Sequence, residues 1–251
     1  MKPAAFEYHA PTTVDEVVGL LGEHADECKP LAGGQSLVPM LALRLTRFEH
    51  IVDLNRVGEL AGVDRVDGAL RIGAMTRQRA VERDATTAAA VPLVARAVPF
   101  IGHTQIRNRG TIGGSLAHAD PASELPAVAL ALDADFEVAS SGGRRTVPAA
   151  EFFEGTWTTC LGDDELLIAC SFPVWEGRCG FAFDEIARRS GDFALAGVGA
   201  AVELGPDGTV QRCALGMLGV ASTPVRAPEA EASVLGRAPT GADLEEVGQL
   251  A

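Results

Sequence analysis

Hydrophobic residues near the start of the chain recur at the spacing of an α-helix. Val14, Val17, Val18 and Leu21 occupy positions i, i+3, i+4 and i+7. Thr13 forms a capping-box pattern in front of them, so a helix is expected directly after it. The short apolar run at residues 28–31 predicts a strand that leads into a glycine turn, and residues 50–55 predict another strand.

Later in the chain, turn signals separate pairs of strand-like segments. Asp67 and Gly68 predict a hairpin over residues 62–74, and Gly142 and Gly143 predict a second one over residues 135–147. The apolar run at residues 164–175 predicts a buried strand stopped by Pro173. Two long strands joined at residues 205–208 are predicted in the C-terminal part.

Helices are expected between these strands. The predicted segments are residues 77–84 with Thr76 as the cap, 92–102 with Pro92 in the first turn, 123–133, 228–235 and 240–250. Helices and strands mix without regular βαβ alternation, which favours an α+β fold over a doubly wound sheet. The character of the chain changes near residue 176, so two domains are expected, 1–176 and 177–251.

Charge and composition exclude several classes of function. The 251-residue chain carries a formal net charge of −13, which disfavours non-specific binding to nucleic acid or anionic membranes. Its five cysteines include no C-x-x-C pair, and no second histidine stands at ligand spacing from His103 or His118. No metal ligands are therefore expected on this chain. The absence of a signal-peptide pattern or a membrane-span run favours a cytoplasmic location.

Two stretches share one design, "LAGGQSL" at residues 31–37 and "GTIGGSL" at residues 110–116. Adjacent glycines remove the Cβ atoms that would keep a ligand away, and successive amides can converge on an anion. This suits a pyrophosphate held by backbone N–H groups. Neutral donors and positive charges in the same stretches are Gln35, Ser36, Thr111, Ser115, Arg107 and Arg109.

A structural explanation stands beside this one. A single Gly-Gly pair is typical of a tight turn, and His103 and His118 fit hydrogen-bonded structural residues. Ser123 and Glu124 fit a helix N-cap followed by a first-turn acid. The chain has no P-loop, no G-x-S-x-G elbow and no visible catalytic constellation. Spacing alone thus predicts a protein that binds a phosphate-bearing cofactor, without naming it.

Four ordered motifs add a resemblance: "LAGGQSLVPMLALRL" followed by "HIVDLNRV", then "LRIGAMT", "QIRNRGTIGGSLAHADPASELPAVALAL" and "ARRSGDFALAGVGAAV". Together they resemble the FAD-binding medium subunit of the molybdenum hydroxylases, the family of xanthine dehydrogenase and aerobic carbon monoxide dehydrogenase. The resemblance runs from the N-terminus to about residue 219. It implies a two-lobed α+β FAD-binding domain of the vanillyl-alcohol-oxidase (PCMH) type, followed by a smaller C-terminal α+β domain.

The resemblance also implies which residues contact FAD. The pyrophosphate positions correspond to Ala32, Gly33, Gly34, Gln35 and Ser36 in the first loop, and to Thr111, Ile112, Gly113, Gly114 and Ser115 in the second. Further positions lining the flavin or its ribityl and adenosine parts correspond to Leu31, Leu37, Ala74, Ile106, Gly110, His118, Ser123 and Glu124. Ile168 corresponds to an apolar contact late in the domain.

Two departures from the family pattern stand out. Asp184 occupies a cofactor-site position where some relatives place a lysine near the flavin, so a positive charge there is absent or supplied elsewhere. The sequence also ends at Ala251 without the family's terminal helical segment and its Asp/Ser…Tyr-Arg-Arg pattern, so either the C-terminal domain is abbreviated or its tail is missing from this sequence.

The implied role is electron transfer. In such enzymes a large subunit oxidises the substrate at a molybdenum cofactor. Electrons then pass through two [2Fe–2S] clusters on a small subunit to the FAD of the medium subunit, and on to an external acceptor. No catalytic residue is expected on this chain, and the family implies a heterohexamer of two three-chain units. The alternatives are a stand-alone flavin oxidase or reductase and a scaffold subunit without FAD.

Overall fold

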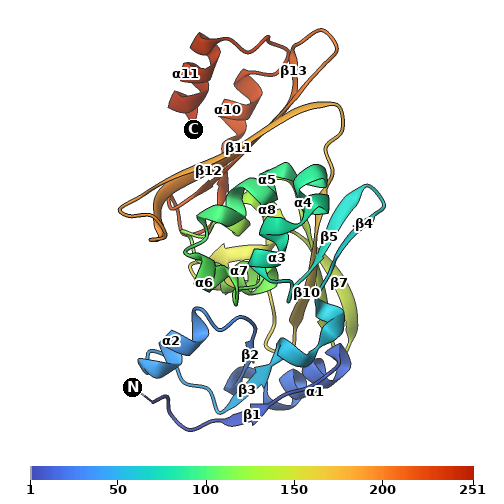
Figure 1. The fold of residues 1–251 in the computed structure, drawn as a ribbon, viewed down its shortest axis with the longest axis vertical. Coiled ribbons are helices and arrows are strands. Elements are labelled where there is room, and N and C mark those ends of the chain that lie inside the picture. The colour runs from blue at the N-terminus through green and yellow to red at the C-terminus, as the bar shows by residue number, and fades with distance from the viewer. Residues whose placement is uncertain (1) are drawn as a thin grey trace.

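The computed structural model describes residues 2–251 and shows an elongated α+β molecule (Figure 1). Along its length lie an N-terminal lobe, a middle lobe, and a C-terminal sheet covered by the last helices. The predicted fold class is confirmed. None of the helices in the described part of the chain combines the length and apolar character that crossing a membrane requires.

The N-terminal lobe is a small parallel sheet covered by one helix. Its strands β1 (Glu7–His9), β3 (His50–Asp53) and β2 (Cys28–Leu31) pair in that order. Helix α1 (Val14–His24) buries the predicted apolar stripe, and the capping box at Thr13 is present. The short helix α2 (Leu37–Ala42) follows the first glycine-rich segment.

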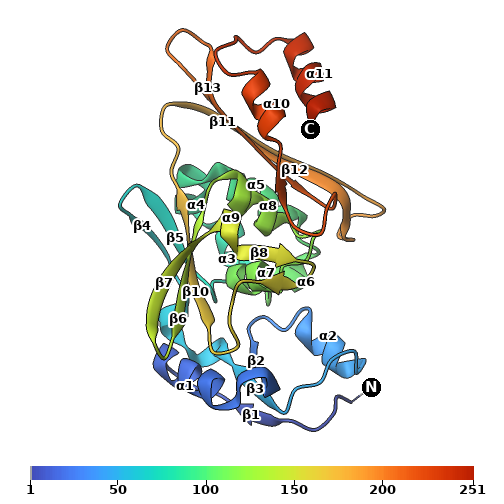
Figure 2. The same cartoon turned by 180° about the vertical axis from the view of Figure 1, so that it is seen from behind.

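The middle lobe is built on an antiparallel sheet with the order β4–β5–β10–β6–β7. The strands are β4 (Val63–Val66), β5 (Ala69–Gly73), β10 (Leu166–Pro173), β6 (Asp135–Ser140) and β7 (Gly143–Pro148). Both predicted hairpins and the buried strand ending at Pro173 are confirmed. Seen from behind, β6 and β10 reach toward α1, which packs on them and joins the two lobes (Figure 2).

Short helices fill the space between this sheet and the C-terminal domain. They are α3 (Gln78–Arg83), α4 (Ala85–Ala90), α5 (Pro92–Ala97), α6 (Thr104–Arg107), α7 (Ile112–His118), α8 (Glu124–Ala131) and α9 (Ala149–Phe152), with a small ribbon of β8 (Phe153–Gly155) and β9 (Thr158–Thr159). Helix α8 is apolar on nearly every side, the pattern of a helix buried all round.

The C-terminal domain is a four-stranded antiparallel sheet in sequential order. Its elements are β11 (Arg178–Ala187), β12 (Ala194–Leu204), β13 (Val210–Leu218), β14 (Val225–Arg226), α10 (Pro228–Ser233) and α11 (Gly241–Leu250). The two long strands and both terminal helices are confirmed. Strand β11 was not predicted, because its residue types do not follow its alternation of exposed and inward positions: Ala182 and Ile186 are exposed, and an inward position holds Glu185.

One core spans the middle lobe and the C-terminal sheet. Leu93 of α5 and Val128 of α8 belong to the same buried cluster as Ala201, Ala214 and Leu218 of the sheet. The N-terminal lobe has a separate cluster, which α1 forms with β3 and β10. The C-terminal domain is therefore anchored on the middle lobe by shared apolar packing.

Two local predictions were wrong, and a third holds only in part. Thr76 does not cap α3, because its hydroxyl donates to the Gly62 carbonyl and accepts from the Gly62 amide, both at 3.0 Å. Ser123 stands at the N-cap position of α8 without a capping hydrogen bond. The second glycine pair is not a loop, since Gly113 and Gly114 lie in the first turn of α7.

Candidate cofactor-binding site

The two glycine-rich segments meet backbone to backbone. A Cβ atom at Gly33 would lie 2.8 Å from Gly110 Cα and 2.9 Å from the Arg109 carbonyl carbon. Real Cβ atoms do not approach backbone that closely, so only glycine at position 33 permits this junction. The segment after β2 therefore lies directly against the segment before α7.

The first glycine of the second pair has a packing role. A Cβ at Gly113 would lie 2.7 Å from Ala74 Cα, and the Gly113 amide donates to the Ala74 carbonyl at 2.8 Å. The Ala74 amide in turn donates to the Ile168 carbonyl at 2.9 Å. Gly113 thus allows α7 to pack directly against the end of β5. The next residue, Gly114, faces Ala32, whose Cβ would be 3.2 Å from an added Cβ.

Asn55 and Arg77 connect the two segments, and sequence reasoning did not identify either. The Asn55 side-chain amide donates to the Ala32 carbonyl of the first segment at 3.2 Å. The Arg77 guanidinium donates to the Asn55 side-chain oxygen and to the Arg109 carbonyl of the second segment. Asn55 lay within the "HIVDLNRV" motif, which was the one available signal for it.

The first segment presents unused backbone donors. Within residues 2–251, the amides of Gly33, Gly34, Gln35 and Ser36 make no hydrogen bond to protein. Gly34 has φ +73°, a conformation that a glycine tolerates. The Gln35 side chain folds back and donates to the Gly33 carbonyl at 3.0 Å. Successive free amides at a bend are the donor set that a phosphate group requires, so these residues fit a dinucleotide cofactor.

The second segment adds donors at the start of α7. The Thr111 hydroxyl caps this helix by accepting from the Gly114 amide at 3.0 Å. The Ile112 amide donates to the Thr76 carbonyl at 3.0 Å and is not available to a ligand. The Thr111 amide has no acceptor among the described residues. The two segments therefore contribute unequally, with most free amides on the first.

Positive charge at the junction comes from Arg77 and Arg109. Burial and the neighbouring Arg109 charge lower the pKa of Arg77. Burial acts to raise the pKa of Asp53, but hydrogen bonds from Tyr8 and Asn55, with a smaller contribution from Arg109, lower it overall. Arg107 does not contribute, because it is buried and paired with Glu82 at 2.9 Å. In the sequence Arg107 and Arg109 are equivalent candidates for a ligand contact. In the structure Arg107 is buried and structural, whereas Arg109 is exposed beside the junction.

The far end of α7 holds a second polar group. The hydroxyls of Ser115 and Ser123 are 2.9 Å apart. His118 stacks on the exposed ring of Trp157, with Nε2 4.0 Å from an Asp120 carboxylate oxygen. Burial lowers the pKa of His118, which keeps it neutral near pH 7.

Glu124 is the most perturbed carboxyl group in this region. Its side chain begins α8 and is 8% exposed, and burial raises its pKa to about 8, with the charges of Glu185 and Asp120 acting in the same direction. Burial and Asp184 also raise the pKa of Glu185, one of whose oxygens is buried without a hydrogen-bond partner. Glu124 is therefore a buried carboxyl group, the half-buried Glu185 is close enough to raise its pKa further, and at neutral pH Glu124 carries a proton.

The remaining residues matched by resemblance divide into two groups. Ile112 and Ile168 are fully buried, whereas Leu31, Leu37 and Ile106 are partly exposed beside the junction. Asp184 lies on exposed strand β11, and its carboxylate accepts from the Glu185 amide at 2.9 Å. Asp184 thus belongs to the C-terminal sheet, outside the two glycine-rich segments.

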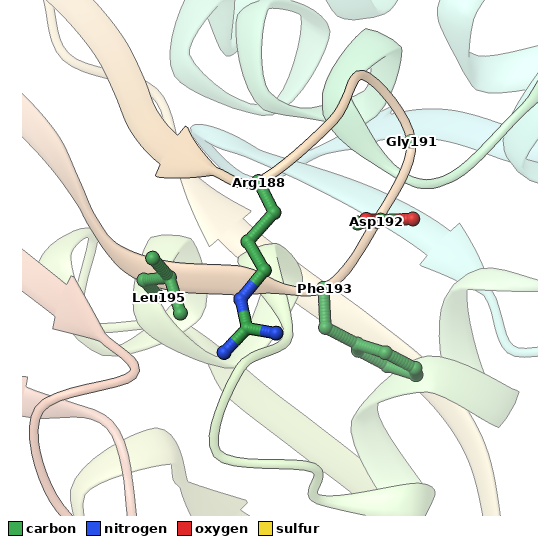
Figure 3. A pocket seen from close by; sticks show the side chains of 5 residues that line it. All are labelled: Arg188, Gly191, Asp192, Phe193 and Leu195. Carbon is green, nitrogen blue, oxygen red and sulfur yellow. The ribbon is translucent and has the colours of Figure 1, made fainter.

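The turn between β11 and β12 packs against the middle lobe. A Cβ at Gly191 would lie 2.8 Å from His103 Nε2, so this turn packs on the residue just before α6. Beside it a hollow of about 350 Å³ is lined by Arg188, Asp192, Phe193 and Leu195 (Figure 3). The hollow is formed by the turn itself and contains none of the glycine-rich residues.

Comparison with known proteins agrees with this geometry. Residues 4–175 match the FAD binding domain in molybdopterin dehydrogenase, and residues 181–251 match the CO dehydrogenase flavoprotein C-terminal domain. The chain is 40% identical to the carbon monoxide dehydrogenase medium chain of Hydrogenophaga pseudoflava, covering 95% of this chain and 83% of that one. It is 42% identical to the alpha subunit of the 6-hydroxypseudooxynicotine dehydrogenase complex of Paenarthrobacter nicotinovorans, covering 92% and 78%.

A solved structure of carbon monoxide dehydrogenase from Hydrogenophaga pseudoflava superposes on the whole chain with a TM-score of 0.96 at 40% identity, covering 87% of that chain. Both lobes and the C-terminal sheet therefore share the architecture of that protein. On the matched domains and these identities, the chain belongs to the family of FAD-binding medium subunits of the molybdenum hydroxylases.

Proposed function

We propose that this chain holds one FAD at the junction of its two glycine-rich segments and serves as the electron-transfer subunit of a molybdenum hydroxylase. The observation that carries the proposal is the run of free amides at residues 33–36, held against the second segment by the Asn55–Arg77 connection. Such amides bind a diphosphate without needing a basic surface, which an acidic chain lacks.

The proposed contacts follow the family positions. In this proposal the diphosphate is surrounded by ten residues of the two glycine-rich segments: Ala32, Gly33, Gly34, Gln35, Ser36, Thr111, Ile112, Gly113, Gly114 and Ser115. The rest of the cofactor is lined by Leu31, Leu37, Ala74, Ile106, Gly110, His118, Ser123, Glu124, Ile168 and Asp184. When bound, FAD supplies the ability to accept electrons singly and release them in pairs. Arg77 and Arg109 would offset the charge of the diphosphate, and protonated Glu124 would add no negative charge near it.

The proposal extends to the assembly. The chain would bind a large molybdenum-cofactor subunit and a small [2Fe–2S] subunit in a cytoplasmic heterohexamer of two three-chain units. Residues 1–176 would form the FAD-binding domain and residues 177–251 the C-terminal domain. Support comes from the relatives, which are named as medium chains or as subunits of dehydrogenase complexes.

The test is to purify the full chain alone and then with its two partner subunits. We expect one FAD per chain, with absorption bands at about 370 and 450 nm, and no oxidation of organic substrate until the partners are added. Turnover by the chain alone would instead show a stand-alone oxidase. A correctly folded chain that binds no flavin even when FAD is added would show a scaffold.

A further inference from the structure

Three of the five histidines meet in the N-terminal lobe, at the end of β3 opposite to the one that faces the first glycine-rich segment. His9 ends β1, His24 ends α1 and His50 begins β3. One ring nitrogen from each lies within 4.8 Å of the others, and all three residues are partly buried. Their wide separation in sequence hides this cluster from any search for ligand spacing, which is why the sequence analysis expected no metal ligands.

The fold explains how they meet. In the parallel pair β1–β3, His50 stands opposite Glu7, and His9 lies two residues beyond on the same face of the sheet. Helix α1 packs across the sheet through its apolar stripe, and its last residue is His24. The imidazole rings of His24 and His50 stack with centroids 3.7 Å apart and planes at 10°.

The spacing of the nitrogens suits metal coordination, although one of the stacked His24 and His50 rings must rotate so that both point a nitrogen at a common ion. His9 Nε2 and His50 Nδ1 are 3.1 Å apart. Two imidazole nitrogens bound to one tetrahedral Zn²⁺ at about 2.0–2.1 Å are separated by roughly 3.3 Å. A fourth oxygen ligand is at hand, since a Glu7 carboxylate oxygen lies 3.8 Å from His50 Nδ1.

The three imidazole rings are also available to bind a metal ion. Among the described residues, the His9–His50 contact is the one hydrogen bond that these rings make with protein. Glu7 is 68% exposed, and the His50 side chain retains 16% exposure, so an ion can enter from solvent. Imidazole nitrogens favour Zn²⁺, Cu²⁺ and Ni²⁺ over Mg²⁺ and Ca²⁺, which take oxygen ligands.

We propose that His9, His24 and His50 bind one Zn²⁺-class transition-metal ion, with Glu7 or water as the remaining ligand. The ion would tie the first strand, the end of α1 and the start of β3 together. It lies at the amino end of β3, whereas Asp53 and the first glycine-rich segment lie at the carboxyl end. Its role is therefore structural, and it is independent of whether FAD is bound.

The test is calorimetric titration of Zn²⁺ into the full-length chain after removal of any affinity tag and treatment with EDTA. We expect one saturable site per chain, and a higher Tm with Zn²⁺ than without it. The substitutions His24→Gln and His50→Gln should each weaken binding at least about ten-fold and remove the Tm shift. His103→Gln is the matched control, because His103 is exposed and outside the cluster, and it should bind as wild type does.

Cu²⁺ provides a second readout, since its EPR spectrum resolves coupling to bound imidazole nitrogens. Nitrogen coupling that is present in wild type and in His103→Gln, and reduced in His24→Gln, would support the site. If His50→Gln does not fold, His24→Gln alone supplies the comparison. Zn²⁺ binding of equal affinity in wild type and both cluster variants, or only weak binding at many sites, would overturn the proposal.

Discussion

At the scale of single residues, the junction depends on the absence of side chains more than on their presence. Gly33 faces the backbone of residues 109 and 110, and neither can retreat without separating the two segments. The glycines are therefore needed for the two segments to contact each other, and the neighbouring amides without protein partners can donate to a ligand.

We expect Gly33→Val to abolish FAD binding in the purified chain while leaving α1 and the C-terminal sheet folded. The added side chain would force the junction open, because its nearest neighbours are backbone atoms. The ratio of absorbance at about 450 nm to that at 280 nm measures the loss. Gly19→Ala in α1 is the control, since nothing lies within 4 Å of its Cβ position, and it should retain full flavin content.

Glu124 predicts a pH dependence of stability. Its pKa is about 8 in the folded chain and near the ordinary 4.5 when unfolded, so the folded state holds a proton that the unfolded state releases. The free energy of unfolding should therefore fall as pH rises through this window, by up to about 1.4 kcal/mol per unit, and level off above pH 8.

Glu124→Gln removes this group while keeping its size. Comparing Tm values of the variant and wild type from pH 5 to 9 isolates the effect, even though Glu185 has a pKa raised in the same direction. The advantage of the variant should grow with pH and then become constant. Parallel curves for the two proteins would contradict the burial of this carboxyl group.

At the scale of secondary-structure elements, the sequence predicts what local signals determine. The capping box before α1, the turn at Asp67 and Gly68, and the stop at Pro173 each act within a few residues, and each is found in the structure. Strand β11 was missed because an exposed position holds Ile186 and an inward position holds Glu185, so the alternation of burial is not visible in the residue types.

Parts of the site could not be predicted for a different reason. The connection from Ala32 through Asn55 and Arg77 to Arg109 joins four separate stretches of the chain. Nothing local in the sequence marks such partners, because their pairing is decided by how the lobes pack. The repeated Gly-Gly pattern and the resemblance both indicated the glycine-rich segments, and only the structure shows what holds them together.

Helix α8 and strand β13 pack closely enough to be tested. A Cβ at Gly216 would lie 2.9 Å from Ala131 Cβ and 3.0 Å from the Ala127 carbonyl carbon. We expect Gly216→Ala to lower the free energy of unfolding by roughly 1–3 kcal/mol through overpacking, measured by urea denaturation. Gly180→Ala in β11 of the same sheet meets no atom within 4 Å and should change stability far less.

At the scale of the whole molecule, the shared core makes the middle lobe and the C-terminal sheet one structural unit. Phe183, Ala201 and Leu218 are buried in the same cluster as α5 and α8. Arg226 strengthens the connection, since it donates to the Leu130 carbonyl at 3.2 Å and pairs with Asp133 at 2.9 Å. The boundary between the domains in sequence is therefore no boundary in packing.

We expect the slowest amides of α8 and β13 to exchange hydrogen through the same global unfolding event. Their protection should fall in parallel as denaturant is added, because neither element can keep its core without the other. Hydrogen exchange followed by mass spectrometry on the purified chain measures this. Exchange of β12 and β13 through an opening that leaves α8 protected would show that the C-terminal sheet unfolds independently.

The contact of Gly33 with Gly110 has a consequence for biosynthesis. The two glycine-rich segments are separated in the sequence by the first hairpin and several helices. A nascent chain of one hundred residues therefore lacks the second segment and cannot form the nucleotide site. Flavin loading must then wait until the segment at residues 109–116 has left the ribosome, and the loaded form gains its extra resistance to unfolding by mass action.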